Sequence, residues 1–161
     1  MKGDCLMRFL GIDPGLGGAA CVIGDGEIPL LYTAPVVAAG ARGKNVPDLA
    51  AMNALLSENQ PIELAVVEEV NGNPKFGSSN FVFGGSYYGW QALLTARGIP
   101  FVTVRPKRWQ AAFGITGKGK GTKAQAKAKA NALFPIRATE SDADAVLLAE
   151  YARRLRVGGA T

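Results

Sequence analysis

The chain has 161 residues, which favours a single domain spanning residues 1–161, long enough to bury a core without disulfides. Apolar residues make up 48% and charged residues 19%, which excludes a disordered charged tail. Histidine is absent, which excludes a Ser-His-Asp triad, a histidine general base and a histidine zinc site. Hydrolytic chemistry would therefore depend on carboxylates, lysine or a metal ion held by oxygen ligands.

The cellular compartment is indicated by the cysteine content and by the lack of membrane-spanning and signal segments. Its two cysteines, Cys5 and Cys21, are too few for a zinc site and are typical of reduced thiols. No run of about 18 apolar residues is present, and the first residues do not resemble a signal peptide. We therefore expect a cytoplasmic protein without a membrane partner.

The predicted elements follow one another as in a mixed α/β domain. Three strands come first, and Asp25-Gly26 is a hairpin turn signal between the second and the third. A loop at 36–46 leads into alternating helices and strands. We expect strands at 7–13, 19–25, 27–35, 63–70 and 100–104, and helices at 46–59, 83–97, 106–114, 122–134 and 141–156. Thr122 would cap the fourth helix, and Ser141 or Asp142 the last. This order predicts an antiparallel three-stranded start followed by βα units.

Charge is distributed very unevenly along the chain. Residues 70–139 contain no Asp or Glu and carry 11 Lys and Arg residues. A solvated surface normally mixes both signs. A one-sided segment is typical of a protein that binds a polyanion, so we favour nucleic acid over a merely solvated basic face.

Two glycine-rich segments superficially resemble nucleotide-binding loops. Residues 15–20 fit GxGxxA, but Gly24-Asp25-Gly26 interrupts the helix that the motif requires, and no acid follows at the required spacing. Residues 114–123 resemble a phosphate loop, but Gly121 stands where Ser or Thr is needed. We expect no nucleotide cofactor, and a basic loop that faces DNA.

Carboxylates stand at three informative positions. Asp13 and Glu68 each close an apolar strand, and a cluster comprising Glu140, Asp142 and Asp144 opens the last predicted helix. Each alone has an ordinary explanation, such as capping a turn, pairing with lysine or stabilising the first helical turn. Together, in a histidine-free basic chain, they suggest oxygen ligands for Mg²⁺, with Mn²⁺ as a substitute. Two such ions can support phosphodiester hydrolysis, which indicates a nuclease.

Four motifs occur in a recognisable order: GIDPGLGGA at 11–19, AVVEEV at 65–70, the basic segment with GTKAQAKAKANALFP at 121–135, and DADAVLLAEY at 142–151. The chain thereby resembles the RuvC-type Holliday junction resolvases of the retroviral integrase and ribonuclease H superfamily. Residues 83–110 look closest to the phage-type and chloroplast branches. The resemblance implies an α/β fold with a five-stranded mixed sheet flanked by helices.

The resemblance also assigns roles to single residues. It implies that Asp13, Glu68 and Asp144 are catalytic acids and metal ligands, and that Lys123 contacts DNA. Trp109 and Gln110 stand where bacterial enzymes carry Val-Lys. Lys107 or Arg108 would replace the lysine contact that is missing there, and Lys118 and Lys120 of the basic loop are the other DNA-binding candidates.

The fourth catalytic acid departs from the bacterial pattern. Bacterial members place it three residues before the last acid, which is Ser141 here, whereas phage-type sequences place it four before, at Glu140. On a helix, Glu140 lies about 40° from Asp144 and Asp142 about 160°. Glu140 is therefore the prediction if the helix already includes it, with Asp142 as the alternative if the helix begins at 142.

The resemblance further implies a symmetric homodimer that nicks two opposing strands of a four-way junction. The helix at 83–97 is rich in Gly, Ala and aromatic residues, which suits packing on a second copy or in the core. One of Phe76, Phe81 and Phe83 could stack on an unpaired base. Alternatives are a nuclease for flaps or forks, a non-catalytic DNA-binding module of the same fold, and an ATP-handling protein, which would need two such domains.

Overall fold

The computed structural model describes residues 6–39, 43–70, 77–117 and 119–158, with only the backbone for 77–80. Its centre is a five-stranded sheet in the order β3-β2-β1-β6-β7. The strands are β1 (Arg8–Ile12), β2 (Ala19–Gly24), β3 (Leu30–Thr33), β6 (Ile62–Glu68) and β7 (Phe101–Val104). β2 and β3 run antiparallel to their neighbours, whereas β1, β6 and β7 are parallel. The predicted five-stranded mixed sheet is confirmed.

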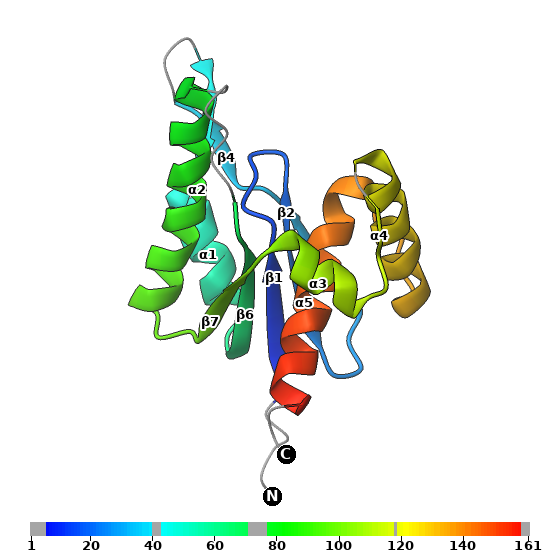
Figure 1. Cartoon of the computed structure of the whole chain (residues 1–161). Coiled ribbons are helices and arrows are strands. Elements are labelled where there is room, and N and C mark those ends of the chain that lie inside the picture. Colours follow the sequence, from blue (N-terminus) through cyan, green and yellow to red (C-terminus); the bar gives the residue numbers. More distant parts are fainter. Residues whose placement is uncertain (1–5, 40–42, 71–76, 118, 159–161) are drawn as a thin grey trace, which may run out of the picture.

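Helices cover both faces of the sheet (Figure 1). They are α1 (Leu49–Glu58), α2 (Gly77–Ala96), α3 (Pro106–Ala112), α4 (Lys120–Leu133) and α5 (Glu140–Gly158). Alternate strand residues point to opposite faces, so Phe9 packs with α3, α4 and α5, while Leu10 packs with α1 and α2. The sheet therefore separates two apolar clusters.

The central contact of the fold is between α5 and β1. A Cβ atom at Gly11 would overlap main-chain atoms of Ala145 and Ala149, so only glycine allows this approach. The alanines one helical turn apart on α5 keep its facing surface flat. The helix therefore lies with its backbone directly against the strand.

Some local predictions were wrong. The segment predicted as a loop at 36–46 contains a hairpin of β4 (Val36–Ala38) and β5 (Asn45–Pro47), whose β-branched valines favour strands. α2 begins at Gly77 rather than at 83. α4 begins at Lys120, so Thr122 does not cap it; its hydroxyl donates to the Gly119 carbonyl at 2.7 Å.

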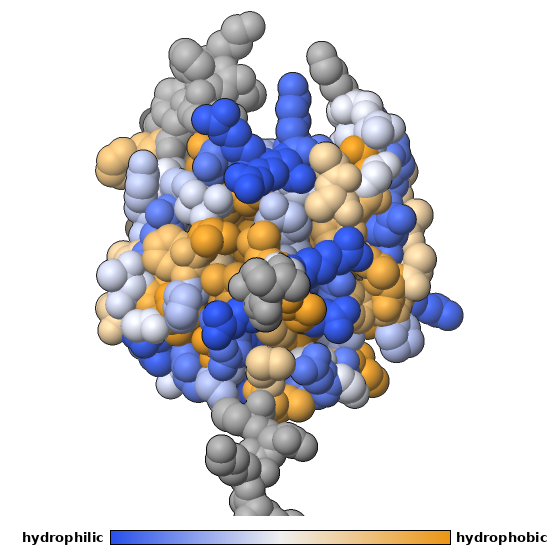
Figure 2. Space-filling model, turned by 60° about the horizontal axis from the view of Figure 1, so that its bottom comes forward, coloured by the Kyte–Doolittle hydropathy of each residue, from blue (hydrophilic) through white to orange (hydrophobic). Residues whose placement is uncertain are grey.

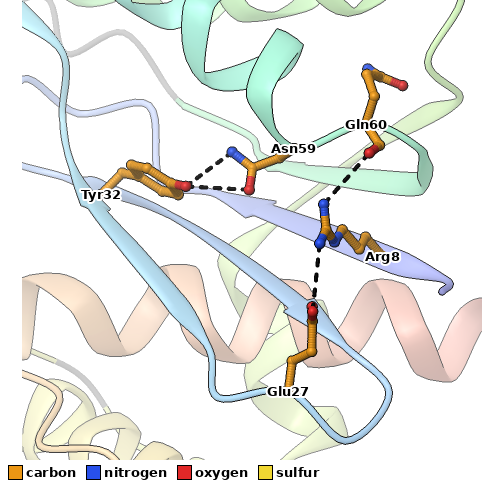
Figure 3. A network of polar contacts seen from close by, with 5 residues as sticks. All are labelled: Arg8, Glu27, Tyr32, Asn59 and Gln60. Carbon is orange, nitrogen blue, oxygen red and sulfur yellow. Dashed lines mark hydrogen bonds and ion pairs between the residues drawn. The ribbon is translucent and has the colours of Figure 1, made fainter.

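Polar contacts join β1 and β3 to the segments beside them (Figure 3). Arg8 donates to the Gln60 carbonyl and pairs with Glu27, each at 3.5 Å. Asn59 donates to the Tyr32 hydroxyl at 3.0 Å. These contacts tie β1 to the β2–β3 turn, and β3 to the end of α1. Their role is therefore to hold the fold together.

Candidate active site

Asp13 and Glu68 lie beside one another at the carboxyl ends of two parallel strands. The register pairs Ile12 of β1 with Val67 of β6, so the next residue on each strand is an acid. In open α/β sheets this edge is where ligands bind. Side chains along a strand alternate between the two faces of the sheet. Glu68 lies two residues after Val66, which is buried on the α5 face, so the Glu68 side chain points to that face too.

The turn after β1 holds the Asp13 side chain in place. Its Oδ1 accepts a hydrogen bond from the Gly15 N–H at 3.1 Å, and its own N–H donates to the Ala19 carbonyl at 2.9 Å. A Cβ atom at Gly18 would overlap the Asp13 carbonyl oxygen and crowd its carboxylate. The glycines of residues 15–18 therefore shape a tight turn around Asp13, not a nucleotide loop.

Asp144 joins these two acids from α5, and the three interact electrostatically. Burial, with the nearby charges of Asp13 and Asp144, raises the pKa of Glu68 to about 8. Burial and the charge of Asp13 raise the pKa of Asp144 to about 6. Burial also raises the pKa of Asp13. The structure thus brings together the three acids predicted from the sequence, in a place where their negative charges are poorly compensated.

The donor chemistry of this cluster fits a hard divalent cation, because all its ligand atoms are carboxylate oxygens. Within the described ranges, however, no group of three or more His, Cys, Asp and Glu side chains has the geometry of a metal site. Mg²⁺ is usually held by one or two carboxylates plus water and substrate phosphate, so a complete protein ligand shell is not required.

Glu68 and its neighbour Glu69 have different environments. Glu68 Oε1 accepts a hydrogen bond from the Trp109 indole N–H at 2.8 Å. Glu69 instead pairs with Arg105 at 3.1 Å and accepts from the Thr103 hydroxyl at 3.5 Å, on the other side of the sheet edge. Only Glu68 takes part in the acid cluster. The Trp109 contact was missed in the sequence, where Trp109 appeared only as a departure from Val-Lys.

The basic residues predicted to bind DNA that the structure describes lie on α3 and α4. Lys123 on α4 lies closest, since its charge lowers the pKa of all three acids. Lys107 and Arg108 are exposed on α3, and Lys120 is exposed at the start of α4. Lys118 lies outside the described residues. Of these described basic residues, Lys123 is therefore the one that interacts electrostatically with the three carboxylates.

Comparisons with known proteins bear on the fold of the chain. No protein-family model matches the chain, and no curated protein matches it in sequence. Among solved structures, RuvC of T. thermophilus in complex with a Holliday junction substrate matches at TM-score 0.66 and 17% identity, covering 94% of this chain and 96% of that one. A second structure of T. thermophilus RuvC matches at TM-score 0.62 and 18% identity, covering 94% and 97%.

The chain has the RuvC fold. The likeness extends over nearly the whole of both chains, so the resemblance predicted from the four motifs is confirmed at the level of the fold. At 17% and 18% identity the likeness shows the fold alone, so the roles of individual side chains are argued from the geometry of this chain.

The start of α5 bears on the fourth acid predicted from the sequence, Glu140 or Asp142. Asp142 Oδ2 accepts from the Thr139 N–H at 2.9 Å, and the Thr139 hydroxyl accepts from the Asp142 N–H at 3.3 Å. This reciprocal pair is a capping box, so Thr139, and not Ser141 or Asp142, occupies the cap position. α5 already includes Glu140, one turn before Asp144. Glu140 is exposed and is not among the charges that shift the pKa of the other acids, so the structure does not bring it into the cluster.

The predicted stacking phenylalanines lie in different environments. Phe81 on α2 is 86% exposed. Phe83 is half-buried, and a Cβ atom at Gly15 would lie 3.4 Å from its ring, which places it against the turn that holds Asp13. Phe76 lies outside the described residues. Phe81 is therefore the more accessible ring, and Phe83 supports the turn.

A hollow of about 460 Å³ lies away from the acids, at the far end of α5 and the start of β1. Figure 2 shows the end of the molecule that lies at the bottom of Figure 1, where hydrophobic and hydrophilic residues are mixed. The hollow is lined by Met7, Phe9, Asp25, Glu150, Arg153, Arg154, Val157 and Gly158. Buried Glu150 pairs with Arg153 at 2.8 Å and Arg154 at 2.9 Å, so its charge is compensated. The buried acid of this hollow is thus paired with arginine, which distinguishes it from the acid cluster at the ends of β1 and β6. In the part of the chain that the structure describes, no helix is long and apolar enough to cross a membrane.

Proposed function

We propose that this protein is a structure-selective DNA endonuclease that resolves four-way junctions by metal-dependent phosphodiester hydrolysis. The observation that carries the proposal is the cluster of Asp13, Glu68 and Asp144 in a RuvC fold, with the pKa of Glu68 raised to about 8. Buried acids that raise each other's pKa are costly to a fold and are typical of functional sites. The T. thermophilus neighbour in complex with a Holliday junction substrate supports the choice of DNA.

Asp13, Glu68 and Asp144 would hold Mg²⁺, or Mn²⁺ in its place. Glu140, which is exposed one turn before Asp144, would have to turn inward to join them as the fourth ligand. When bound, two such ions stabilise the attacking and leaving oxygens of a phosphodiester and activate water. The chain itself supplies the oxygen ligands and positions them at the ends of β1 and β6. Lys123 limits the repulsion among the acids, since it lowers the pKa of each.

DNA would lie along α4 and α3. Successive helical residues are about 100° apart, so Lys120, Lys123 and Lys127 share one side of α4, within about 60° of one another. α4 carries no acid, and Lys107 and Arg108 extend the positive surface onto α3. Such a surface binds phosphates without reading sequence. Selectivity for branched DNA would then depend on how two copies present their sites.

A second copy would pack on α2, giving a homodimer with two sites. Residues 77–96 contain no charged side chain. The exposed positions Phe81, Gly85, Tyr88, Ala92 and Ala96 fall within about 80° of one another around the helix. An uncharged stripe of aromatic and small residues suits close packing of two helices, and a two-fold dimer matches the symmetry of a four-way junction.

Two alternatives are distinguished by observations on this chain. A non-catalytic DNA-binding module has no need of a buried cluster of acids with raised pKa values, so the cluster favours an enzyme. A nuclease for flaps or forks would use the same site, and only the substrate separates it. We place the activity in the cytoplasm, where the buried free thiol of Cys21 would remain reduced.

The test is a cleavage assay on synthetic four-way junctions, flaps, forks and plain duplexes, each with Mg²⁺, Mn²⁺ or EDTA. We expect paired nicks on opposing strands of the junction with either metal and none with EDTA. If flaps or forks are cleaved in preference to junctions, the proposed substrate is that branched DNA and not the four-way junction. Tight junction binding without cleavage under any metal would overturn the enzymatic proposal in favour of the binding module.

A further inference from the structure

Trp109 makes a contact for which core packing gives no reason. Its side chain is completely buried in the cluster on the α5 face, and its indole N–H reaches Glu68 Oε1 at 2.8 Å. An indole has a single donor and no acceptor, so this bond has only one possible direction. The bond also lowers the pKa of Glu68, against the larger effect of burial. A buried side chain thus binds one oxygen of a central acid.

The ring is fixed in its orientation by a series of contacts behind it. Phe113 packs edge-on against Trp109, with ring centroids 6.5 Å apart at 66°. The Arg154 guanidinium lies 4.4 Å from the centre of the Phe113 ring. Arg154 is itself held by buried Glu150 at 2.9 Å and donates to the Ala112 carbonyl at 3.3 Å. These contacts anchor α3, with Trp109, to α5.

The start of α3 is attached to the same strand that carries Glu68. Arg105, immediately before α3, pairs with Glu69 at 3.1 Å. Glu68, which ends β6, and Glu69, which follows it, are therefore each bound by a residue of the Arg105–Trp109 segment. The position of the indole relative to Glu68 is set at both ends of α3, independently of any ion.

We propose that Trp109 is a positioning residue, whose indole N–H fixes the Glu68 carboxylate through Oε1 and leaves Oε2 to bind the divalent cation. The proposal deepens the proposed function and rests on it. A neutral donor orients the carboxylate without adding a positive charge that would compete with the cation, as a lysine there would. Partners that bind a ligating carboxylate in this way typically contribute 10–100-fold to metal affinity or activity.

Trp90 offers a matched control. It is the only other tryptophan of the chain, it is 2% exposed, and it lies in the apolar cluster on the opposite face of the sheet. Trp109→Phe and Trp90→Phe each shorten a buried aromatic side chain, but only the first removes the donor to Glu68. In the Trp90→Phe protein, Trp109 is the sole tryptophan, so quenching of its fluorescence by Mn²⁺ reports binding beside Glu68.

The experiment measures Mn²⁺ affinity without DNA, by electron paramagnetic resonance, and the Mg²⁺ concentration that half-saturates junction cleavage. We expect Trp109→Phe to weaken both about 10–100-fold, with the rate at saturating metal changed much less, and Trp90→Phe to change neither. Equal metal dependence in the two variants would overturn the proposal, because Trp109 would then only fill the core.

A second variant covers the case in which Trp109→Phe fails to fold. In the Trp90→Phe background, Trp109 is replaced biosynthetically by benzothienylalanine, which keeps the ring shape and substitutes sulfur for the N–H. The same loss of Mn²⁺ affinity is expected, and unchanged affinity would overturn the proposal. Wild-type protein that binds Mn²⁺ but cuts no DNA overturns only the nuclease function. Wild-type protein that binds no Mn²⁺ overturns both proposals.

Discussion

The two faces of the sheet are built from the same strands but differ in charge and in the use that we propose for them. On the face covered by α3, α4 and α5, the apolar cluster ends at three half-buried acids beside Lys123. On the other face, α2 runs for 20 residues without a charged side chain and exposes Phe81 and Tyr88. The period of two along each strand produces this separation. If two copies assemble through α2, chemistry on one face and assembly on the other should be separable by mutation.

The largest effect should follow from removing an acid on the α5 face. Asp13→Asn keeps the size of the side chain but removes the charge that attracts a cation. We expect junction cleavage to fall more than about 100-fold, beyond the effect of losing a partner of a metal ligand. Junction binding should persist, as measured by gel mobility shift with Ca²⁺ or EDTA. A folded variant that loses binding together with cleavage would give Asp13 a structural role.

Glu140 and Asp142 should respond differently although they are two residues apart. Glu140→Gln should reduce cleavage by orders of magnitude, with partial recovery at high Mn²⁺, if Glu140 joins Asp144 as a ligand. Asp142→Asn keeps an acceptor for the Thr139 N–H, so cleavage and Tm should change little. If Asp142→Asn is inactive and Glu140→Gln is active, Asp142 is the metal ligand and Glu140 is not.

A charge placed on the uncharged surface of α2 should disrupt dimer formation. Tyr88→Lys places a charge at the centre of the exposed stripe of α2, where Tyr88 is 68% exposed. We expect a dimer to dissociate, measured by sedimentation velocity, with paired nicking lost and Mn²⁺ affinity retained. Ser57→Lys, at an exposed position of α1 on the same face, is the matched control and should remain dimeric. A Tyr88→Lys protein that stays dimeric would place the interface elsewhere.

The raised pKa values predict how stability depends on pH when EDTA removes divalent ions. Folded protein keeps a proton on Glu68 up to about pH 8, whereas unfolded protein releases it near the usual 4.5. Stability from this group is therefore complete below pH 4.5 and decreases as pH rises to about 8. We expect Tm to fall by a few degrees over this range, since about 1 kcal/mol moves Tm by about 2–4 °C. Glu68→Gln should flatten the dependence, and Mg²⁺ at pH 8 should raise the wild-type Tm.

The smallest effects should come from single basic residues of the DNA surface. Lys107→Ala, Arg108→Ala and Lys123→Ala should each lower the slope of log affinity against log salt by about 1, as expected for one phosphate contact. Lys123→Ala should also move the pH profile of cleavage upward, because its charge lowers the pKa of the acids. An unchanged slope would remove that residue from the interface.

The positions of Asp13 and Glu68 could be predicted because each follows an apolar run typical of a buried strand. Apolar runs that stop at Asp13 and Glu68 identify the ends of two strands, and parallel pairing places such ends together. Asp144 required the motif resemblance in addition, because an acid in the first turns of a helix has an ordinary explanation. The sheet and its flanking helices followed from the order of the elements.

Other features depend on tertiary contacts that no local pattern encodes. The bond between Trp109 and Glu68 joins residues 41 positions apart and depends on how α3 is anchored. The cap at Thr139 was missed because Ser141 and Asp142 are equally good cap residues by composition. The hairpin of β4 and β5 is short and flanked by small residues, so it resembled a loop.

The contact at Gly11 has a consequence for redesign. Asp13 lies two residues after Gly11 on β1, and Asp144 lies one residue before Ala145 on α5. Since Gly11 meets Ala145 through main-chain atoms, the separation between the two acids is set by backbone dimensions rather than by side-chain volume. Repacking the surrounding core with larger or smaller apolar residues should therefore leave that spacing nearly constant. A single methyl group at position 11 would instead force the helix away from the strand and widen the site.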